Sequence, residues 1–334
     1  MTRYNIYGVG NALVDSEYEI HETFLAQANI KKGTTALVTL EERLGLIEKL
    51  AAHEHQVIKQ AGGGSAANTI VAVSQLGGKA FYTCKVANDD IGDFFLKDLA
   101  LADVATNMSL ERADREPGHT GECISMITPD AERTMATHLG ITEHVAPQDL
   151  RPEFISQSDY IYIEGYLVSS ASSFQTALEA VAIARAAGVK VALTLSDPAM
   201  VEYFKENFDL LINAGVDLLF CNKQEALLWS GTSTIEAAIE VLQSRFNGFA
   251  LTLGSAGSVV YDGKLHEIAP VATKAVDTTG AGDSFAGAFL YGITNGLTFA
   301  EAGALGSKAA SLLVSSFGAR LSQAAVDEHL KIRP

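Results

Sequence analysis

The amino-acid sequence predicts an α/β fold in which a doubly wound, mostly parallel sheet is flanked by helices and carries a small β-sheet lid. Short β-branched or aromatic runs recur along the chain, and segments of about 10 to 18 residues with helical periodicity separate most of them. Because strand and helix alternate, we expect successive strands to be parallel and joined by helices. The expected buried strands are residues 4–9, 80–86, 160–164, 189–195, 218–221 and 249–253.

The length and composition fit a globular protein with a large core. The 334 residues are 48% hydrophobic and 19% charged, which excludes a disordered chain or a coiled coil. This length allows two domains, or one large domain with an insertion. We expect a single α/β domain over residues 1–334, interrupted by lid segments at approximately 16–40 and 109–139.

The charge balance restricts the partners of the protein. The chain has 24 Lys and Arg against 40 Asp and Glu, a net charge of −16 that repels a nucleic-acid backbone. Any anionic substrate must therefore be held by helix ends, backbone amides or bound cations. The N-terminus lacks an apolar signal-peptide core, and no run approaches the roughly 18 apolar residues of a membrane span. We expect a cytoplasmic protein without nucleic-acid or membrane partners.

The first strand leads directly to a candidate ligand-binding residue. Asp15 lies shortly after residues 4–9, at the carboxyl edge where open α/β sheets bind their ligands. Its carboxylate could accept two hydroxyl hydrogen bonds from a sugar. A turn aspartate without a ligand is the alternative interpretation.

Two stretches interrupt the alternation of strands and helices, at 16–40 and 109–139. In the second, residues 122–128 alternate polar and apolar side chains before a Pro-Asp turn, as in a strand with one face in water. Because a helical unit separates the two stretches, we expect them to converge into one small sheet set over the main domain as a lid. Two ordinary surface excursions are the alternative.

A glycine-rich loop opens the next helix. Gly62, Gly63 and Gly64 precede a helical pattern that continues to Gly77, so the backbone of this loop can approach a ligand closely. The loop also satisfies a dinucleotide-binding pattern, G-x-G-x-x-A. That interpretation requires residues 56–59 to be the first strand of a nucleotide-binding unit, although an earlier strand already fills that place.

Two later helices have recognisable ends. Residues 172–187 have helical periodicity and end at Gly188, a residue type that closes helices in the left-handed conformation. Asn222 and Glu225 form an Asn-x-x-Glu pattern at the start of another helix, which is a capping-box arrangement. Both patterns support the predicted alternation of strands and helices.

The most informative segment is residues 276–288, in which glycines open a helix with an acid in its first turn. Free N–H groups and the positive end of the helix dipole make such a place an anion site, and two nearby glycines let a phosphate approach the backbone. Asp283 would face this place and could accept a proton from a hydroxyl that attacks a phosphate. Taken alone, a tight turn with an acid at a helix N-terminus is the alternative.

Taken together, these motifs resemble those of the ribokinase family, the PfkB-type carbohydrate and nucleoside kinases, over residues 8 to about 319. The run 62–68 is similar to the first family signature and the run 277–283 to the second, with the Asn-x-x-Glu pattern between them. The resemblance implies a ribokinase-like fold whose β-sheet lid closes over the sugar. It also implies a phosphotransferase that uses ATP and Mg²⁺, and it leaves open a monovalent-cation requirement and a homodimer.

The resemblance further implies a role for each candidate residue. Asp283 would be the catalytic base, and the amides of Gly280, Ala281 and Gly282 would form the anion hole for the transferring phosphate. The positions that match substrate-binding residues are Asn11, Asp15, Gly63, Gly64 and Asn68. The positions that match nucleotide-binding elements are Asn222, Thr252, Gly254 and Gly257, and Glu225 would help to place magnesium through water.

Two segments are similar to the adenosine-kinase branch of the family. Residues 10–15 are similar to the Gly-Asn-Pro-Leu-Leu-Asp start of adenosine kinases, with Ala12 in place of the proline. Residues 162–169 are similar as well, with Tyr166 where an aromatic side chain can stack on a base. The run 65–67 is nearer the sugar-kinase pattern. We therefore expect transfer of the γ-phosphate of ATP to a primary hydroxyl of a ribose-containing small molecule, with a nucleoside such as adenosine preferred.

Three alternatives stay open. A free-sugar kinase for ribose, fructose or a keto-sugar acid would use the same chemistry with a different pocket, and a sugar acid would need a cation, for which Arg133 is the candidate. A nucleotide-dependent oxidoreductase would use the Gly62 loop. A catalytically silent ligand sensor built on a kinase fold is the third, and the intact Gly-Ala-Gly-Asp string argues against it.

Overall fold

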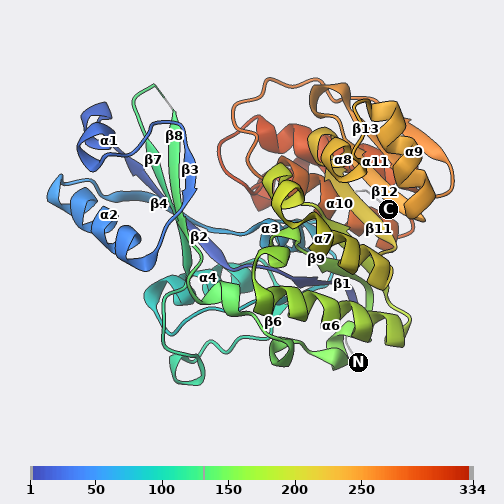
Figure 1. Ribbon diagram of the computed structural model, residues 1–334, viewed down its shortest axis with the longest axis horizontal. Coiled ribbons are helices and arrows are strands. Elements are labelled where there is room, and N and C mark those ends of the chain that lie inside the picture. Colours follow the sequence, from blue (N-terminus) through green and yellow to red (C-terminus); the bar gives the residue numbers. More distant parts are fainter. Residues whose placement is uncertain (1–2, 131, 331–334) are drawn as a thin grey trace.

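The computed structural model describes residues 3–130 and 132–330, which form two sheets and the helices that cover them (Figure 1). The main sheet has nine strands. In order across the sheet these are β14 (Leu265–Ile268), β13 (Ser258–Tyr261), β12 (Gly248–Thr252), β11 (Leu218–Asn222), β10 (Lys190–Thr194), β9 (Ser158–Ile163), β1 (Tyr4–Val9), β5 (Ala80–Thr83) and β6 (Val104–Thr106). All neighbours from β12 to β6 pair in parallel, and β13 and β14 continue antiparallel at one edge.

Each of the six strands expected from the sequence is present in this sheet, near its expected ends. The chain runs outward from β1 through β5 to β6, and then returns to build β9 to β12 on the other side of β1. The strand order therefore reverses between β1 and β9. In an open α/β sheet, ligands bind at the carboxyl ends of the strands beside such a reversal.

Helices cover both faces of the main sheet, as expected for a doubly wound fold. The helices are α3 (Ser65–Gln75), α4 (Asp90–Leu101), α5 (Pro152–Ile155), α6 (Ala171–Ala187), α7 (Pro198–Gly215), α8 (Lys223–Ser230), α9 (Ile235–Arg245), α10 (Ala281–Thr294), α11 (Phe299–Val314) and α12 (Gln323–His329). One core packs α6 to α9 against the sheet, and the other packs α3, α4, α10 and α11 against the opposite face. No helix in the described part of the chain is long and apolar enough to span a membrane.

A second sheet of five strands stands apart from the main sheet and is joined to it through β2 and β4 (Figure 1). Its strand order is β3 (Thr35–Leu37), β8 (Arg133–His138), β7 (Gly121–Ile127), β2 (Leu13–Glu19) and β4 (Val57–Gly63). Both interrupted stretches of the sequence supply strands to it. The sheet also extends beyond those stretches, because β2 begins at Leu13 and β4 lies outside them.

The second sheet has its own small core on the face covered by α1 (Glu22–Ala28) and α2 (Leu40–Ala52). The expectation of a water-exposed face on residues 122–128 is wrong, because β7 is the central strand and is buried on both faces. Glu122 accepts hydrogen bonds from Arg43 Nε of α2 at 2.8 Å and from Ser16 Oγ at 2.6 Å. Glu122 and Thr128 are thus paired inside the protein rather than solvated, and Ser125 Oγ is buried without a hydrogen-bond partner among the described residues.

Candidate active site

The two glycine-rich motifs of the sequence meet at the carboxyl edge of the main sheet. Helix α3 begins at Ser65 and α10 begins at Ala281. Ser65 Oγ donates a hydrogen bond to Asp283 Oδ1 at 2.6 Å, and Asn68 Nδ2 donates one to Asp283 Oδ2 at 3.0 Å. The fold therefore brings residues 218 positions apart in the chain into direct contact.

Asp283 is half-buried and held by hydrogen-bond donors. Burial raises the pKa of its carboxyl group to about 6, while the hydrogen bonds from Ser65 and Asn68 and the charge of Arg320 act to lower it. Because this pKa lies below 7, the carboxyl group is mostly ionised at neutral pH and can accept a proton. A carboxylate with a pKa close to the working pH is suited to general-base catalysis.

The N-terminus of α10 is open. Gly280 precedes the helix in the left-handed conformation, with φ of 75° and no side-chain cap. Among the described residues, the N–H groups of Gly280, Gly282 and Asp283 have no hydrogen-bond acceptor, whereas the N–H of Ala281 donates to the Thr278 carbonyl at 3.2 Å. Gly282 is exposed, and a Cβ placed on it would meet nothing within 4 Å. Unpaired amides at an open helix N-terminus can bind an anion, although one of the three amides assigned to the anion hole is engaged within the turn.

A second carboxylate lies on the second sheet. Asp15 of β2 is in register with Cys123 of β7, so both side chains lie on the same face of that sheet. A Cβ at Gly63 would lie 2.7 Å from Asp15 Oδ2, so a larger residue there would displace the carboxylate. Burial raises the pKa of Asp15 to about 6, and the charge of Arg320 lowers it. At neutral pH Asp15 therefore presents mainly a carboxylate that can accept hydroxyl hydrogen bonds.

Glu164 is a site residue to which the sequence analysis assigns no role. It follows β9, is 1% exposed, and accepts hydrogen bonds from the Asn11 amide N–H at 3.3 Å, from Asn11 Nδ2 at 2.9 Å and from the Ala66 N–H at 2.8 Å. Burial raises the pKa of Glu164 to about 7, against these donors, which lower it. Gly64 lies beside this cluster at φ of 95°, where a Cβ would collide with the Asn11 carbonyl. The only sequence signal for Glu164 is an acid at the end of a buried strand.

The two glycine-rich helix starts therefore differ. The carboxylate of Glu164 occupies the N-terminus of α3, whereas the N-terminus of α10 is open to an external anion. The strand β4 that leads into the first loop pairs antiparallel with β2 in the second sheet. Residues 56–59 are thus not the first strand of a nucleotide-binding unit, and the dinucleotide-binding interpretation of this loop is wrong.

The predicted capping box is present at the start of α8. The Glu225 N–H donates to Asn222 Oδ1 at 2.9 Å, and the Glu225 carboxylate accepts from the Asn222 N–H at 2.9 Å and from Asn222 Nδ2 at 2.6 Å. Burial raises the pKa of Glu225 to about 7. Thr252 of β12 is in register with Asn222, and Gly254 and Gly257 follow at positive φ in the turn that leads to β13. The structure thus places these predicted residues together at the carboxyl edge of the sheet.

Tyr166 is half-buried in the turn Gly165–Ser169, directly after β9. Its pKa is raised first by burial and then by the negative charges of the carboxylates Asp197, Glu164, Asp283 and Glu225. The phenol therefore lies among the acidic side chains at the carboxyl edge of the main sheet. Its predicted contact with a base stays a prediction.

Comparison with known proteins identifies the family. Residues 33–325 match the model of the pfkB family carbohydrate kinases. The chain belongs to this PfkB family. A ribokinase from Mus musculus is 29% identical over 273 residues, which cover 77% of this chain and 78% of that protein.

Two solved structures resemble this PfkB kinase over nearly its whole length. A probable sugar kinase from Rhizobium etli CFN 42 is 32% identical, with a TM-score of 0.85 and coverage of 98% of this chain and 99% of that one. Adenosine kinase from Sinorhizobium meliloti is 33% identical, with a TM-score of 0.85 and coverage of 98% of each chain.

The family assignment confirms the predicted resemblance, fold class and reaction type. The protein is a phosphotransferase with an alcohol group as acceptor, a sugar or nucleoside kinase of the PfkB family. Membership in a kinase family implies the use of ATP. It leaves the oxidoreductase interpretation without support.

Arg133 of this PfkB kinase is not a free cation for a substrate carboxylate. Its guanidinium is paired with Glu17 at 3.2 Å and with Asp277 at 3.5 Å, and it lies 5.7 Å from the centre of the Phe317 ring. Because both charge partners belong to the protein, the candidate cation for a sugar acid is already neutralised. These contacts join β8 of the second sheet to the loop that precedes α10.

Glu164→Gln should destabilise the fold. The substitution replaces one carboxylate oxygen by an NH₂ group, so a buried donor would face the N–H groups of Ala66 or Asn11. Leaving such donors unpaired costs about 1 to 3 kcal/mol, and we expect the free energy of unfolding to fall by about 2 kcal/mol. Urea denaturation followed by the fluorescence of Trp229 measures this change. The exposed Glu202→Gln variant is the control and should stay within about 0.5 kcal/mol of wild type, whereas an equally small change for Glu164→Gln would contradict the assigned contacts.

Proposed function

We propose that this PfkB kinase transfers the γ-phosphate of ATP to the primary hydroxyl of a nucleoside, with adenosine as the preferred acceptor. The observation that carries the proposal is the Asp283 carboxylate, held at 2.6 Å by Ser65 and at 3.0 Å by Asn68 beside the open N-terminus of α10. A proton acceptor and unpaired backbone donors are thereby placed together, which is what transfer of a phosphoryl group to a hydroxyl requires.

In the proposed reaction, Asp283 accepts the proton of the attacking hydroxyl. The transition state of phosphoryl transfer is loose, so positioning and charge neutralisation contribute more than proton removal does. The N–H groups of Gly280 and Gly282 would donate hydrogen bonds to the phosphoryl oxygens where negative charge collects. Asp15 and Asn68 would orient the sugar by accepting and donating hydrogen bonds to its hydroxyl groups.

A second group of residues, near the start of α8 and the end of β12 at the carboxyl edge of the main sheet, is suited to bind ATP with its metal ion. Thr252 ends β12, and Gly254 and Gly257 lie in the turn that follows it. These three residues would contact ATP, with Asn222 beside Thr252. No cluster of three or more His, Cys, Asp or Glu side chains in the described ranges could hold a metal ion. Glu225 would therefore act through water, since both its oxygens already accept hydrogen bonds from Asn222. Mg²⁺, when bound, neutralises charge on the phosphate oxygens and takes most of its ligands from water and phosphate.

The preference for adenosine is supported by two observations. The adenosine kinase of Sinorhizobium meliloti is 33% identical over 98% of each chain. Residues 10–15 are similar to the start of adenosine kinases, and in this segment Asp15 lies beside Gly63 and Asn11 beside Gly64. The second candidate is a free-sugar kinase, which is favoured by the ribokinase of Mus musculus at 29% identity.

We further propose that the second sheet closes over the acceptor as a lid, since Asp15 lies on it.

An acceptor panel tests this proposal. ADP release should give a kcat/KM for adenosine at least about tenfold above the values for ribose and fructose, because contacts to the base add transition-state binding. The control is 5′-deoxyadenosine, which lacks the accepting hydroxyl and should release no ADP above the background. A higher kcat/KM for ribose would support the free-sugar kinase instead. No ADP release with any sugar or nucleoside would overturn the proposed function.

A further inference from the structure

We infer that Arg320 is a positioning residue for the catalytic base, because its guanidinium fixes the Asn68 amide that holds Asp283 and places a positive charge beside that carboxylate. This inference rests on the proposed role of Asp283 as the base. Arg320 follows α11, lies outside both glycine-rich motifs, and has no role in the sequence analysis above.

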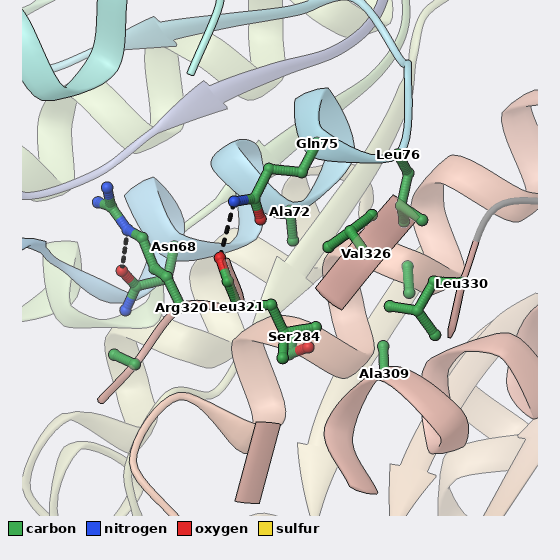
Figure 2. A pocket seen from close by; sticks show the side chains of 12 residues that line it. Asn68, Ala72, Gln75, Leu76, Ser284, Ala309, Arg320, Leu321, Val326 and Leu330 are labelled. Atoms are coloured by element: carbon green, nitrogen blue, oxygen red, sulfur yellow. Dashed lines mark hydrogen bonds between the residues drawn. The ribbon is translucent and has the colours of Figure 1, made fainter. Parts of the chain in front are cut away.

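The hydrogen bonds allow only one orientation of the Asn68 amide. Arg320 Nε donates to Asn68 Oδ1 at 2.8 Å (Figure 2), and Asn68 Nδ2 donates to Asp283 Oδ2 at 3.0 Å. An arginine can only donate hydrogen bonds, and an ionised carboxylate can only accept them. Rotating the amide by half a turn would place donor against donor and acceptor against acceptor. Arg320 therefore determines which atom of Asn68 faces the base.

The guanidinium is itself held in place. Arg320 Nη1 is paired with Asp98 of α4, and the arginine side chain is 14% exposed. A Cβ at Gly62 would lie 2.9 Å from Nη1 and would collide with the Asp98 carboxylate, so the glycine leaves room for this ion pair. Within the described ranges, the buried Nη2 has no acceptor. An arginine with an unpaired buried donor is poorly explained by stability alone, which favours a functional reason for its presence.

The charge of Arg320 acts on both carboxylates of the site. It lowers the pKa of Asp283 and that of Asp15, against the burial that raises both. The other titratable groups that interact with Asp283 are acidic or phenolic, namely Glu164, Glu225, Tyr82, Tyr162 and Tyr166. Removing the arginine charge should therefore raise the pKa of Asp283. As the pH falls, its carboxylate would become protonated, and so stop acting as a base, at a higher pH than in wild type.

The backbone around Arg320 has its own attachments, so a side-chain substitution should leave the segment in place. Gln75 Nε2 of α3 donates to the Leu321 carbonyl at 2.8 Å (Figure 2). Gln323 Nε2 donates to the Gln75 carbonyl at 3.0 Å. Beside Arg320 the packing leaves a cavity of about 10 Å³, lined in part by Ala72 and Ser284. This space is about that of a single water molecule, so little can rearrange there.

The test is the pH profile of kcat for Arg320→Gln. Wild-type kcat should fall below a pH of about 6 as Asp283 becomes protonated. In Arg320→Gln this acid limb should move upward by about one pH unit, so the loss in kcat at pH 6 should exceed the loss at pH 8 by about fivefold. A variant damaged only in its folding would lose the same fraction of its activity at every pH, with no movement of the acid limb. The control is Arg245→Gln on α9, where the arginine donates to Asn213, and its profile should match that of wild type.

Arg320→Lys separates geometry from charge. Lysine keeps the positive charge but has no Nε donor for Asn68, so the acid limb should stay near that of wild type while kcat falls by about fivefold or more at all pH values. An unmoved acid limb in an active, folded Arg320→Gln enzyme would overturn the electrostatic part of the inference. An Arg320→Lys enzyme with wild-type kcat would overturn the positioning part. A wild-type protein that phosphorylates no sugar or nucleoside would instead overturn the proposed function.

Discussion

Replacing Asp283 by Asn should lower kcat by about 10² to 10⁴-fold, the usual contribution of a general base. The Asn side chain cannot take the proton of the attacking hydroxyl. Its NH₂ group would also face the donor of Asn68 or Ser65, so the hydrogen bonds that hold the carboxylate would be broken. Initial rates of ADP release with adenosine measure the loss.

The same variant should bind ATP with an affinity within about threefold of wild type, because the proposed nucleotide contacts are made by other elements. Calorimetric titration with ATP checks this point. Asp262→Asn is the matched control, since Asp262 lies in the turn between β13 and β14 beside His266. Its kcat should be unchanged. More than about a tenth of normal turnover in Asp283→Asn would contradict the assigned role.

Gly280→Ala should lower kcat by about a hundredfold, because it displaces the backbone that forms the open helix start. A Cβ at Gly280 would lie 2.5 Å from the Ala319 carbonyl oxygen and 2.8 Å from the Ala319 Cα, and both are backbone atoms that cannot rotate away. The left-handed φ of 75° adds strain of about 1 kcal/mol for a residue with a side chain. Moving this turn also moves the unpaired amide of Gly282 relative to Asp283.

The Gly188→Ala variant separates the effect of left-handed backbone strain from the effect of a steric collision of the added Cβ. Gly188 ends α6 at φ of 70°, but a Cβ there would meet nothing within 4 Å. We expect Gly188→Ala to lose about 1 kcal/mol of unfolding free energy and to keep normal kcat. Gly280→Ala should lose more stability than this control and most of its activity. Equal stability and equal kcat in the two variants would show that the contact with Ala319 does not position the site.

Local signals explain the part of the fold that was predictable. The buried strands such as 218–221 are continuous apolar runs, and Gly188 and the Asn222 capping box mark helix ends through contacts within a few residues. These signals depend on neighbours along the chain. The same holds for the open start of α10, where glycine and an acid lie within one turn of each other.

Other features depend on partners far away in the sequence. Glu164 accepts hydrogen bonds from Asn11, which is 153 positions away, and Arg320 contacts Asn68 across 252 positions. Neither side chain carries a local pattern that names its partner. The exposed face expected on β7 was wrong for the same reason, because Arg43 of α2 pairs with Glu122 and removes it from water. Arg133 is likewise paired with Asp277 and Glu17, and no local sequence pattern predicts either partner.

The carboxylates of the proposed acceptor site have a consequence for turnover. In the proposed reaction an uncharged hydroxyl compound would bind beside Asp15 and Asp283, and the buried Glu164 lies behind them at the start of α3. Once phosphorylated, the same molecule carries about two negative charges and meets a field of its own sign. The enzyme should therefore release its phosphomonoester product readily and bind it weakly from solution. The product would then inhibit the forward reaction only weakly.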